Sequence, residues 1–237
     1  MRESAGNTLA DIGFDSNGDL DTTALLTHTG VASGYVHTWY DQSGNGNNAV
    51  QSTNANQPQI VSSGSVIVDG NGKATIQFDG SNDFLDTTLI PTYQSFFFAG
   101  VFEINTHYNY NTIFDNDYGI NDWEYWFYST GLSAMRTAAN NTDDFRLDNS
   151  TAVNVNTQVL SVIDVTSTTA SMYIDGSQLD TTSRNNIVTS PSYLNIAGGG
   201  GNTTLNGNFS EFLWYNSDQS SNRTGIEDNI NDHYSIY

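Results

Sequence analysis

Short runs of β-branched and aromatic residues, separated by turns of Asp, Asn and Gly, recur along the whole chain. The segment 74–78 shows the pattern: Ala74, Ile76 and Phe78 alternate with polar residues, directly after the turn 69–72. Alternation with a period of two places apolar side chains on one face of a half-buried strand. Asn and Gly close hairpins at low cost because both tolerate positive φ. The pattern therefore predicts antiparallel sheets.

Other strands follow from the same signals. They are predicted at 35–39, 57–61, 66–68, 95–102, 112–115, 124–128, 132–136, 159–165, 170–174, 193–197 and 207–215. The segment 95–102 is apolar on both faces, which places it centrally in a sheet.

Helical spacing is confined to two places. Near the C-terminus, Ile226, Ile230 and Tyr234 recur at four-residue steps after a capping-box pattern at 224–227. Near the N-terminus, Asp21 is expected to cap one helical turn. No composition break or linker divides residues 1–237, which predicts a single domain.

Charge limits the possible partners. The chain has 26 acidic against six basic residues, a formal net charge of −20, and 21 of the acids are Asp. Asp beside Gly, Asn or Ser bonds its own backbone or a cation, and the acidity also favours solubility. Binding phosphates requires Lys and Arg, so nucleic acid is not expected as a partner.

The chain has no cysteine, so it forms neither disulfides nor thiolate metal sites. No apolar run approaches the roughly 18 residues of a membrane span. Residues 1–6 lack the apolar core of a signal peptide. We expect either a fragment of a longer secreted polypeptide or a protein that leaves the cell by another route, such as on a virus particle.

Four segments, taken in order, resemble a concanavalin A-like lectin/glucanase domain of the laminin G-like kind. They are Trp39–Asn47, Phe78–Leu85, Tyr173–Gly176 and Phe209–Tyr215. Arg2, Ser4, Ile12-Gly13 and the stretch 40–44 also resemble the opening of the arabinofuranosidase B catalytic domain. The segment 221–234 is similar to the short helix that closes such domains in bacterial secreted proteins and phage structural proteins.

This resemblance implies an all-β fold of two antiparallel sheets in a jelly-roll sandwich, one sheet concave, with a short C-terminal helix. It implies carbohydrate recognition or adhesion, often with calcium. We expect a non-catalytic carbohydrate-binding or structural module, extracellular or on a virion as a phage fibre, decoration or adhesion protein. The alternatives are a module of a secreted bacterial adhesin or polysaccharide-degrading enzyme, and a glycoside hydrolase or lyase. Expected partners are a glycan or host-surface polysaccharide, other virion proteins, or further copies of the chain.

Catalysis by a retaining glycosidase needs two carboxyl groups about 5–5.5 Å apart. Glucanases of the resembled fold carry three acids on one strand, where alternation points all of them into the cleft. The nearest string here is 120–124, in which Asp122 and Glu124 fit but Ile120 occupies the nucleophile position. Asp122 and Glu124 are the only catalytic candidates, and such a strand would lack its nucleophile.

Sugar binding needs aromatic rings for the apolar sugar face and amides or carboxylates for the hydroxyls. The region 107–128 supplies both, although alternate rings of 124–128 should face the core. We expect Trp123 and Tyr118 to be exposed rings in a loop. The candidate ligand-binding residues are Tyr108, Tyr110, Tyr118, Asn121, Asp122 and Trp123.

Asp-rich loops are candidate calcium sites because hard cations take several carboxylate, amide and carbonyl oxygens. The metal-ligand candidates are Asp41, Asn45 and Asn47 in one loop and Asp79, Asn82 and Asp83 in another, with Asp115 and Asp117 as a further pair. The alternative is that Asp41 and Asp79 only cap turns through backbone hydrogen bonds, and turn frequency favours it.

Overall fold

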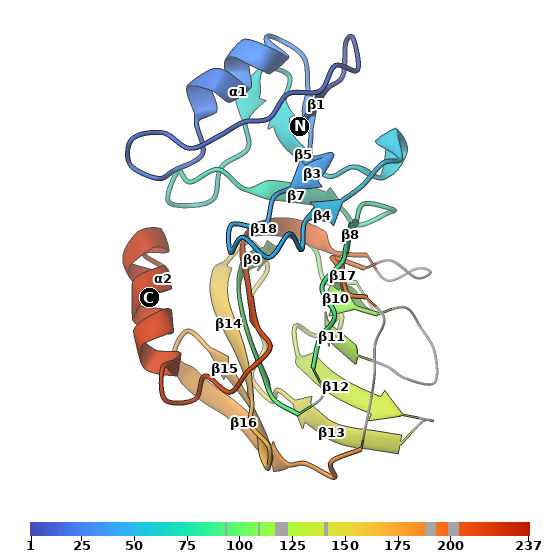
Figure 1. The fold of residues 1–237 in the computed structure, drawn as a ribbon, viewed down its shortest axis with the longest axis vertical. Coiled ribbons are helices and arrows are strands. Elements are labelled where there is room, and N and C mark those ends of the chain that lie inside the picture. The colour runs from blue at the N-terminus through green and yellow to red at the C-terminus, as the bar shows by residue number, and fades with distance from the viewer. Residues whose placement is uncertain (93, 109, 117–122, 140–141, 188–192, 199–203) are drawn as a thin grey trace.

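The computed structural model describes residues 1–237 except 93, 109, 117–122, 140–141, 188–192 and 199–203. Its strands form two antiparallel sheets that stack face to face, with two short helices at the periphery of the described chain (Figure 1). The predicted two-sheet sandwich with a C-terminal helix is confirmed. Neither helix is long and apolar enough to cross a membrane.

The larger sheet has ten strands. In spatial order they are β1 (Arg2–Glu3), β2 (Gly34–Tyr35), β5 (Gln59–Ser62), β7 (Ile76–Asp79), β18 (Asn206–Tyr215), β9 (Phe96–Ile104), β14 (Gln158–Val165), β15 (Thr169–Ile174) and β16 (Ser177–Ser183), with β6 (Ser65–Val66) paired to β5.

The smaller sheet has eight strands. In spatial order they are β13 (Thr142–Asp148), β12 (Ser133–Ala139), β11 (Trp123–Phe127), β10 (Asn111–Asp115), β17 (Asn195–Ile196), β8 (Leu85–Thr87), β4 (Ala49–Val50) and β3 (Thr38–Trp39). The helices are α1 (Thr22–Thr29), the 3₁₀ turn η1 (Asn54–Asn56) and α2 (Arg223–Tyr234).

Aromatic rings fill the space between the sheets. The Phe96 and Trp214 rings are stacked, with centroids 4.8 Å apart. Phe98 meets Phe114 of the other sheet edge to face at 5.0 Å. β9 is buried on both faces, because its remaining apolar side chains lie under α2. The prediction of a central, doubly apolar strand is confirmed.

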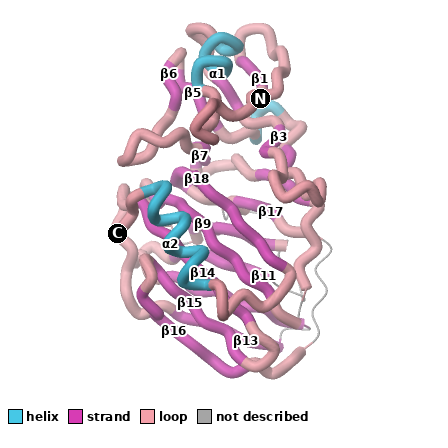
Figure 2. The backbone as a smooth tube through the Cα atoms, turned by 60° about the vertical axis from the view of Figure 1, so that its left-hand side comes forward, coloured by secondary structure: helices cyan, strands magenta, loops and turns pink. Residues whose placement is uncertain are grey.

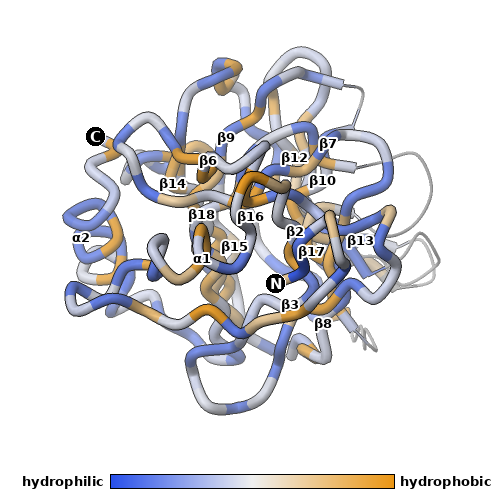
Figure 3. Tube along the Cα trace, turned by 90° about the horizontal axis from the view of Figure 1, so that it is seen from above, coloured by the Kyte–Doolittle hydropathy of each residue, from blue (hydrophilic) through white to orange (hydrophobic). Residues whose placement is uncertain are grey.

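Helix α2 lies against the outer face of the larger sheet, over β9 and β14 (Figure 2). Ile230 and Tyr234 are buried there, as the four-residue spacing predicts, while hydrophilic residues colour much of the rest of the helix (Figure 3). The predicted capping box is not formed, because the helix begins at Arg223 after its N-cap Asn222 and Thr224 therefore lies inside the first turn. Glu227 forms an ion pair with Arg223 instead. Asp21 does cap α1: its Oδ1 accepts the N–H of Ala24 at 2.9 Å.

The predicted strand 35–39 is divided between the two sheets. β2 belongs to the larger sheet and β3 to the smaller one, so the chain crosses between sheets after Tyr35. Strands β13 and β16 were not predicted, because Thr142–Asp148 and Ser177–Ser183 are mostly polar, and in β13 only Phe145 and Leu147 alternate with polar residues. Both are edge strands, which bury fewer side chains.

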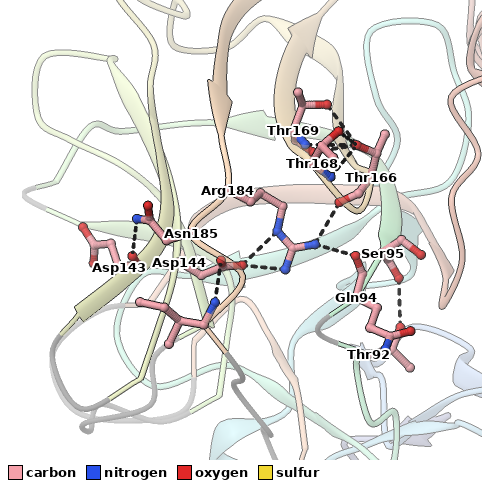
Figure 4. Close-up of polar contacts among 11 residues, drawn as sticks. Thr92, Gln94, Ser95, Asp143, Asp144, Thr166, Thr168, Thr169, Arg184 and Asn185 are labelled. Atoms are coloured by element: carbon pink, nitrogen blue, oxygen red, sulfur yellow. Dashed lines mark hydrogen bonds and ion pairs between the residues drawn. The ribbon is translucent and has the colours of Figure 1, made fainter.

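A buried ion pair joins the two sheets where β13 and β16 approach each other (Figure 4). The Arg184 guanidinium donates to Oδ2 of Asp144 through Nε at 2.9 Å and Nη2 at 2.5 Å. Its Nη1 donates to the carbonyl oxygens of Gln94 and Thr166. Because all of these charges and donors are satisfied, the pair can stay buried at the sandwich edge.

Replacing Asp144 by Ala should lower the free energy of unfolding by about 3–5 kcal/mol, because the Arg184 charge then stays buried without a counter-ion. Urea unfolding measures the change. The matched control is Asp19→Ala, which removes the partner of half-exposed Lys73 and should cost at most about 1 kcal/mol. Equal costs for the two variants would contradict the role given to the buried pair.

Candidate functional site

Alternation along strand β11 determines which of its side chains lie on the outer face of the smaller sheet. Trp123, Tyr125 and Phe127 point into the core, so Glu124 and Trp126 point away from it. The Trp123 ring is 1% exposed and lies 4.9 Å from the Phe96 ring. The prediction that Trp123 is an exposed loop ring is wrong, because β11 begins at this residue and alternation turns its ring inward.

Three rings gather on the outer face, and we call Tyr110, Trp126 and Tyr128 the aromatic cluster. Tyr110 lies 5.8 Å from Tyr128 and 6.4 Å from Trp126, measured between ring centroids. Arg146 from β13 lies over the Trp126 ring at 5.7 Å, and its Nη2 donates to the Tyr128 hydroxyl at 3.1 Å. Tyr110 is 47% exposed, so the cluster presents a ring to solvent.

A row of polar side chains crosses the same face beside the cluster. Strand register pairs Arg136 with Glu124, Glu124 with Asp115, Asp115 with Asn195 and Asn195 with Asp86. Directly paired residues project to the same side of a sheet, and we call these five the polar row. Nε of Arg136 donates to Glu124 at 3.1 Å. Burial raises the pKa of the Asp86 carboxyl above its ordinary value.

The buried polar atoms on this face include two that have no hydrogen-bond partner in the described part of the chain. They are Nε1 of Trp126 and Oδ1 of Asn195, whose residues are 6% and 3% exposed. Leaving such a donor or acceptor unmet costs about 1–3 kcal/mol. Bound hydroxyls or waters that met each of these atoms would recover that free energy, so this face can accept a polar ligand.

The structure brings together only some of the predicted ligand-binding residues. Tyr110 belongs to the aromatic cluster, and Glu124, which was predicted as a catalytic candidate, belongs to the polar row. Tyr108 is 47% exposed but lies beside Gly80, where an added Cβ would come within 3.0 Å of its ring. Tyr118, Asn121 and Asp122 lie outside the described residues, as does Asp117.

The sequence-based prediction missed Trp126, Tyr128 and Arg146, as well as Asp115 and Asn195 as members of one site. Alternation within 123–128, with the phase that buries Trp123, would have identified Trp126 and Tyr128. No comparable signal exists for the polar row, because its members come from strands far apart in the chain and only their register joins them.

The loop after β3 is held by backbone hydrogen bonds. Oδ1 of Asp41 accepts the N–H of Ser43 at 2.8 Å, and Oδ2 accepts the N–H of Asn47 at 2.9 Å. Hydrogen bonding by the Ser43 side chain and by these backbone N–H groups holds the pKa of the Asp41 carboxyl below its ordinary value. Both carboxylate oxygens therefore act in the turn. Calcium bound by Asp41, Asn45 and Asn47 stays a prediction.

The loop after β7 uses its acids in a similar way. Oδ1 of Asp79 accepts the N–H groups of Ser81 and Asn82, and Oδ2 of Asp83 accepts the N–H of Asp79 at 3.1 Å. Burial, with the negative charge of Asp79, raises the pKa of Asp83 to about 7. Among the described residues no three His, Asp or Glu side chains lie close enough to hold a metal ion. Calcium here also stays a prediction.

Comparison with known structures places this fold among β-sandwiches. It is similar to a GH54 α-L-arabinofuranosidase, with a TM-score of 0.72 and 16% identity over 97% of this chain and 57% of that chain. It is also similar to the binding domain of Paraclostridial Mosquitocidal Protein 1 (TM-score 0.63, 18% identity, 86% of this chain, 52% of that chain). A third similar structure is Trypanosoma rangeli sialidase (TM-score 0.54, 15% identity, 78% of this chain, 30% of that chain).

These likenesses concern the fold alone, given the low identities. They agree, at the level of fold, with the resemblance found in the sequence. The chain spans about half the length of the first two structures. No protein-family model and no curated protein sequence matches the chain.

Asp83→Asn should stabilise the protein in a pH-dependent way. The pKa of Asp83 is about 7 in the folded protein and about 4 in the unfolded chain. Its ionisation therefore lowers the free energy of unfolding progressively between about pH 4 and pH 7, and the loss is complete above that range. The variant should therefore match the parent near pH 4 and gain about 1–2 kcal/mol at pH 8, allowing for solvent screening. Urea unfolding at both pH values measures the gain. A gain that is the same at both would contradict the buried, ionisable Asp83.

Proposed function

We propose that the chain is a carbohydrate-binding module that holds a glycan on the outer face of its smaller sheet. The observation that carries the proposal is the meeting of the aromatic cluster and the polar row on one face. A ring such as Tyr110 can stack on the apolar face of a sugar. Carboxylates, an amide and an indole N–H beside it can bond the hydroxyls.

Similar solved structures support this class of ligand. One is an arabinofuranosidase complexed with arabinofuranosyl-α-1,2-xylobiose (TM-score 0.70, 16% identity) and another is a sialidase in complex with sialic acid (TM-score 0.53, 14% identity). The acidity of this chain, −20 in formal charge, favours a neutral glycan or one bridged by a cation such as calcium over an anionic glycan.

We place this module outside the cytoplasm, as a virion component of the fibre, decoration or adhesion type. The terminal segment 221–234 and the cysteine-free sequence motivate that setting. A module of a secreted bacterial adhesin or polysaccharide-degrading enzyme is the alternative, motivated by the longer chains of the similar structures. Particle imaging or secretome analysis of the source separates the two settings.

A glycan array with the purified chain should identify at least one binding glycan. Tyr110→Ala removes the exposed ring and should weaken that binding about tenfold or more, the value of a lost stacking contact. Trp126→Phe keeps the ring but removes the unpartnered indole N–H, and should weaken binding several-fold without loss of stability. Repeating the array with EDTA tests for a calcium bridge.

The matched control is Tyr215→Ala, which removes a partly exposed ring on β18 of the other sheet and should leave binding unchanged. A silent array, or binding that survives both Tyr110→Ala and Trp126→Phe, would overturn the proposed site.

A second candidate function, glycoside hydrolysis, is favoured by one observation within the polar row. Glu124 and Asp115 are paired across adjacent strands, and neighbouring strands lie about 4.7–4.9 Å apart. A retaining glycosidase requires a carboxyl separation of about 5–5.5 Å. Asp115 supplies a carboxylate for the nucleophile role that the segment 120–124 lacks, although Glu124 is engaged in an ion pair with Arg136.

Reducing-sugar release from plant and algal polysaccharides tests this candidate. If the chain hydrolyses one of them, Glu124→Gln and Asp115→Asn should each lower the rate at least about a hundredfold, since each removes one of the two acids. Asp218→Asn, at an exposed carboxylate, is the control. Release that persists in both site variants, or no release at all, would reject hydrolysis at this pair.

A further inference from the structure

A separate pocket of about 420 Å³ opens at the end of the larger sheet that strands β1, β2, β5 and β7 form. These strands lie in the upper part of Figure 1. Its floor lies on the face that points away from the sandwich core, because Ile76 and Phe78 of β7 are buried in the core and Gln77 between them lines the pocket. This volume is within the range of small-molecule sites, about 300–1,000 Å³.

The floor of the pocket consists of side chains that strand register places next to one another. Arg2 pairs with Tyr35, Tyr35 with Gln59 and Gln59 with Gln77, so four neighbouring strands each contribute one side chain to a single row. With strands about 4.8 Å apart, the row is about 14 Å long. That length accommodates one or two sugar rings.

Arg2 differs from the other basic residues of the chain. Five of the six pair with a carboxylate: Lys73 with Asp19, Arg136 with Glu124, Arg146 with Asp148, Arg184 with Asp144 and Arg223 with Glu227. Within the described residues, Arg2 has no such partner.

Neutral oxygens hold the buried Arg2 side chain instead. Nε donates to Oε1 of Gln57 at 2.5 Å, Nη1 to Oδ1 of Asn7 at 2.8 Å and Nη2 to the carbonyl of Asn54 at 3.3 Å. The guanidinium also lies over the Tyr35 ring at 4.7 Å. Since a guanidinium has five N–H groups, two remain to donate to a ligand.

Acceptors line the rest of the pocket. Asp83, only 7% exposed, uses Oδ2 for a backbone N–H, and its Oδ1 accepts no hydrogen bond in the described structure. The amide nitrogens of Gln59 and Gln77 donate within the protein, to Val61 and Asn208, which leaves their carbonyl oxygens for a ligand. Donors at one end and acceptors at the other match a molecule whose hydroxyls both donate and accept.

We propose that this pocket is a second binding subsite that takes a neutral saccharide of one or two rings, with hydroxyls accepting from Arg2 and donating to Asp83, Gln59 and Gln77. The lining carries one cation and two acids, so it exerts no strong net pull on a charged ligand. An anionic sugar would meet Asp79 and Asp83, and a metal ion would meet Arg2. The subsite is independent of the aromatic cluster on the smaller sheet.

Titration of the isotope-labelled chain followed by two-dimensional NMR tests the subsite. The neutral probes are D-galactose, D-xylose, L-arabinose and xylobiose, each at millimolar concentration. D-galacturonate and calcium chloride are the charged comparators. At least one neutral probe should shift the side-chain amide signals of Gln59 and Gln77. The indole N–H signal of Trp126 reports separately on the proposed glycan face, so the two sites can fail independently.

Gln77→Leu should weaken the binding of that probe about tenfold, the loss expected for about one hydrogen bond of roughly 1.4 kcal/mol. The matched control Gln42→Leu, at an exposed glutamine in the loop after β3, should bind as the parent does. No shift at Gln59 or Gln77 with any neutral probe would overturn the subsite. So would a stronger response to galacturonate or calcium than to the neutral sugars.

Discussion

The packing of aromatic rings between the two sheets is the constraint on which the rest of the molecule depends. Phe96, Phe98 and Trp214 of the larger sheet meet Phe114 and Trp123 of the smaller one. These contacts set the phase of each strand, because shifting a strand by one residue would turn every side chain to the opposite face. The register that buries Trp123 therefore also places Glu124 and Trp126 on the outer face.

The chain has few basic residues, and most of them form ion pairs at defined places in the structure. Five of the six basic residues pair with carboxylates: Arg184 closes the edge between the sheets, Arg136 and Arg146 border the proposed glycan face, Arg223 lies on α2, and Lys73 pairs with Asp19. Among the described residues, Arg2 alone has no carboxylate partner and is held by neutral amides, which leaves its charge for the pocket. With so many acids in the chain, an arginine without a carboxylate partner is an informative exception.

Both proposed sites have the same origin. Each is a row of register-paired side chains on the outer face of a sheet, one across β12, β11, β10, β17 and β8 and the other across β1, β2, β5 and β7. Sheets bring together residues that are remote in sequence, and antiparallel pairing keeps them on one face. The first row has the aromatic cluster beside it, whereas the second ends in Arg2, which has no carboxylate partner among the described residues.

Local signals in the sequence were sufficient for most of the strands, for the cap of α1 by Asp21 and for the buried face of α2, because alternation and capping involve neighbours in the chain. They also named Tyr110 as a candidate ligand-binding residue, although they predicted the exposed rings at Trp123 and Tyr118. The phase of β11, the crossing of 35–39 between sheets and both polar rows were decided only by tertiary structure. Each of these depends on which strands pair and in what register, and pairing between distant segments is set by the packing of the whole core.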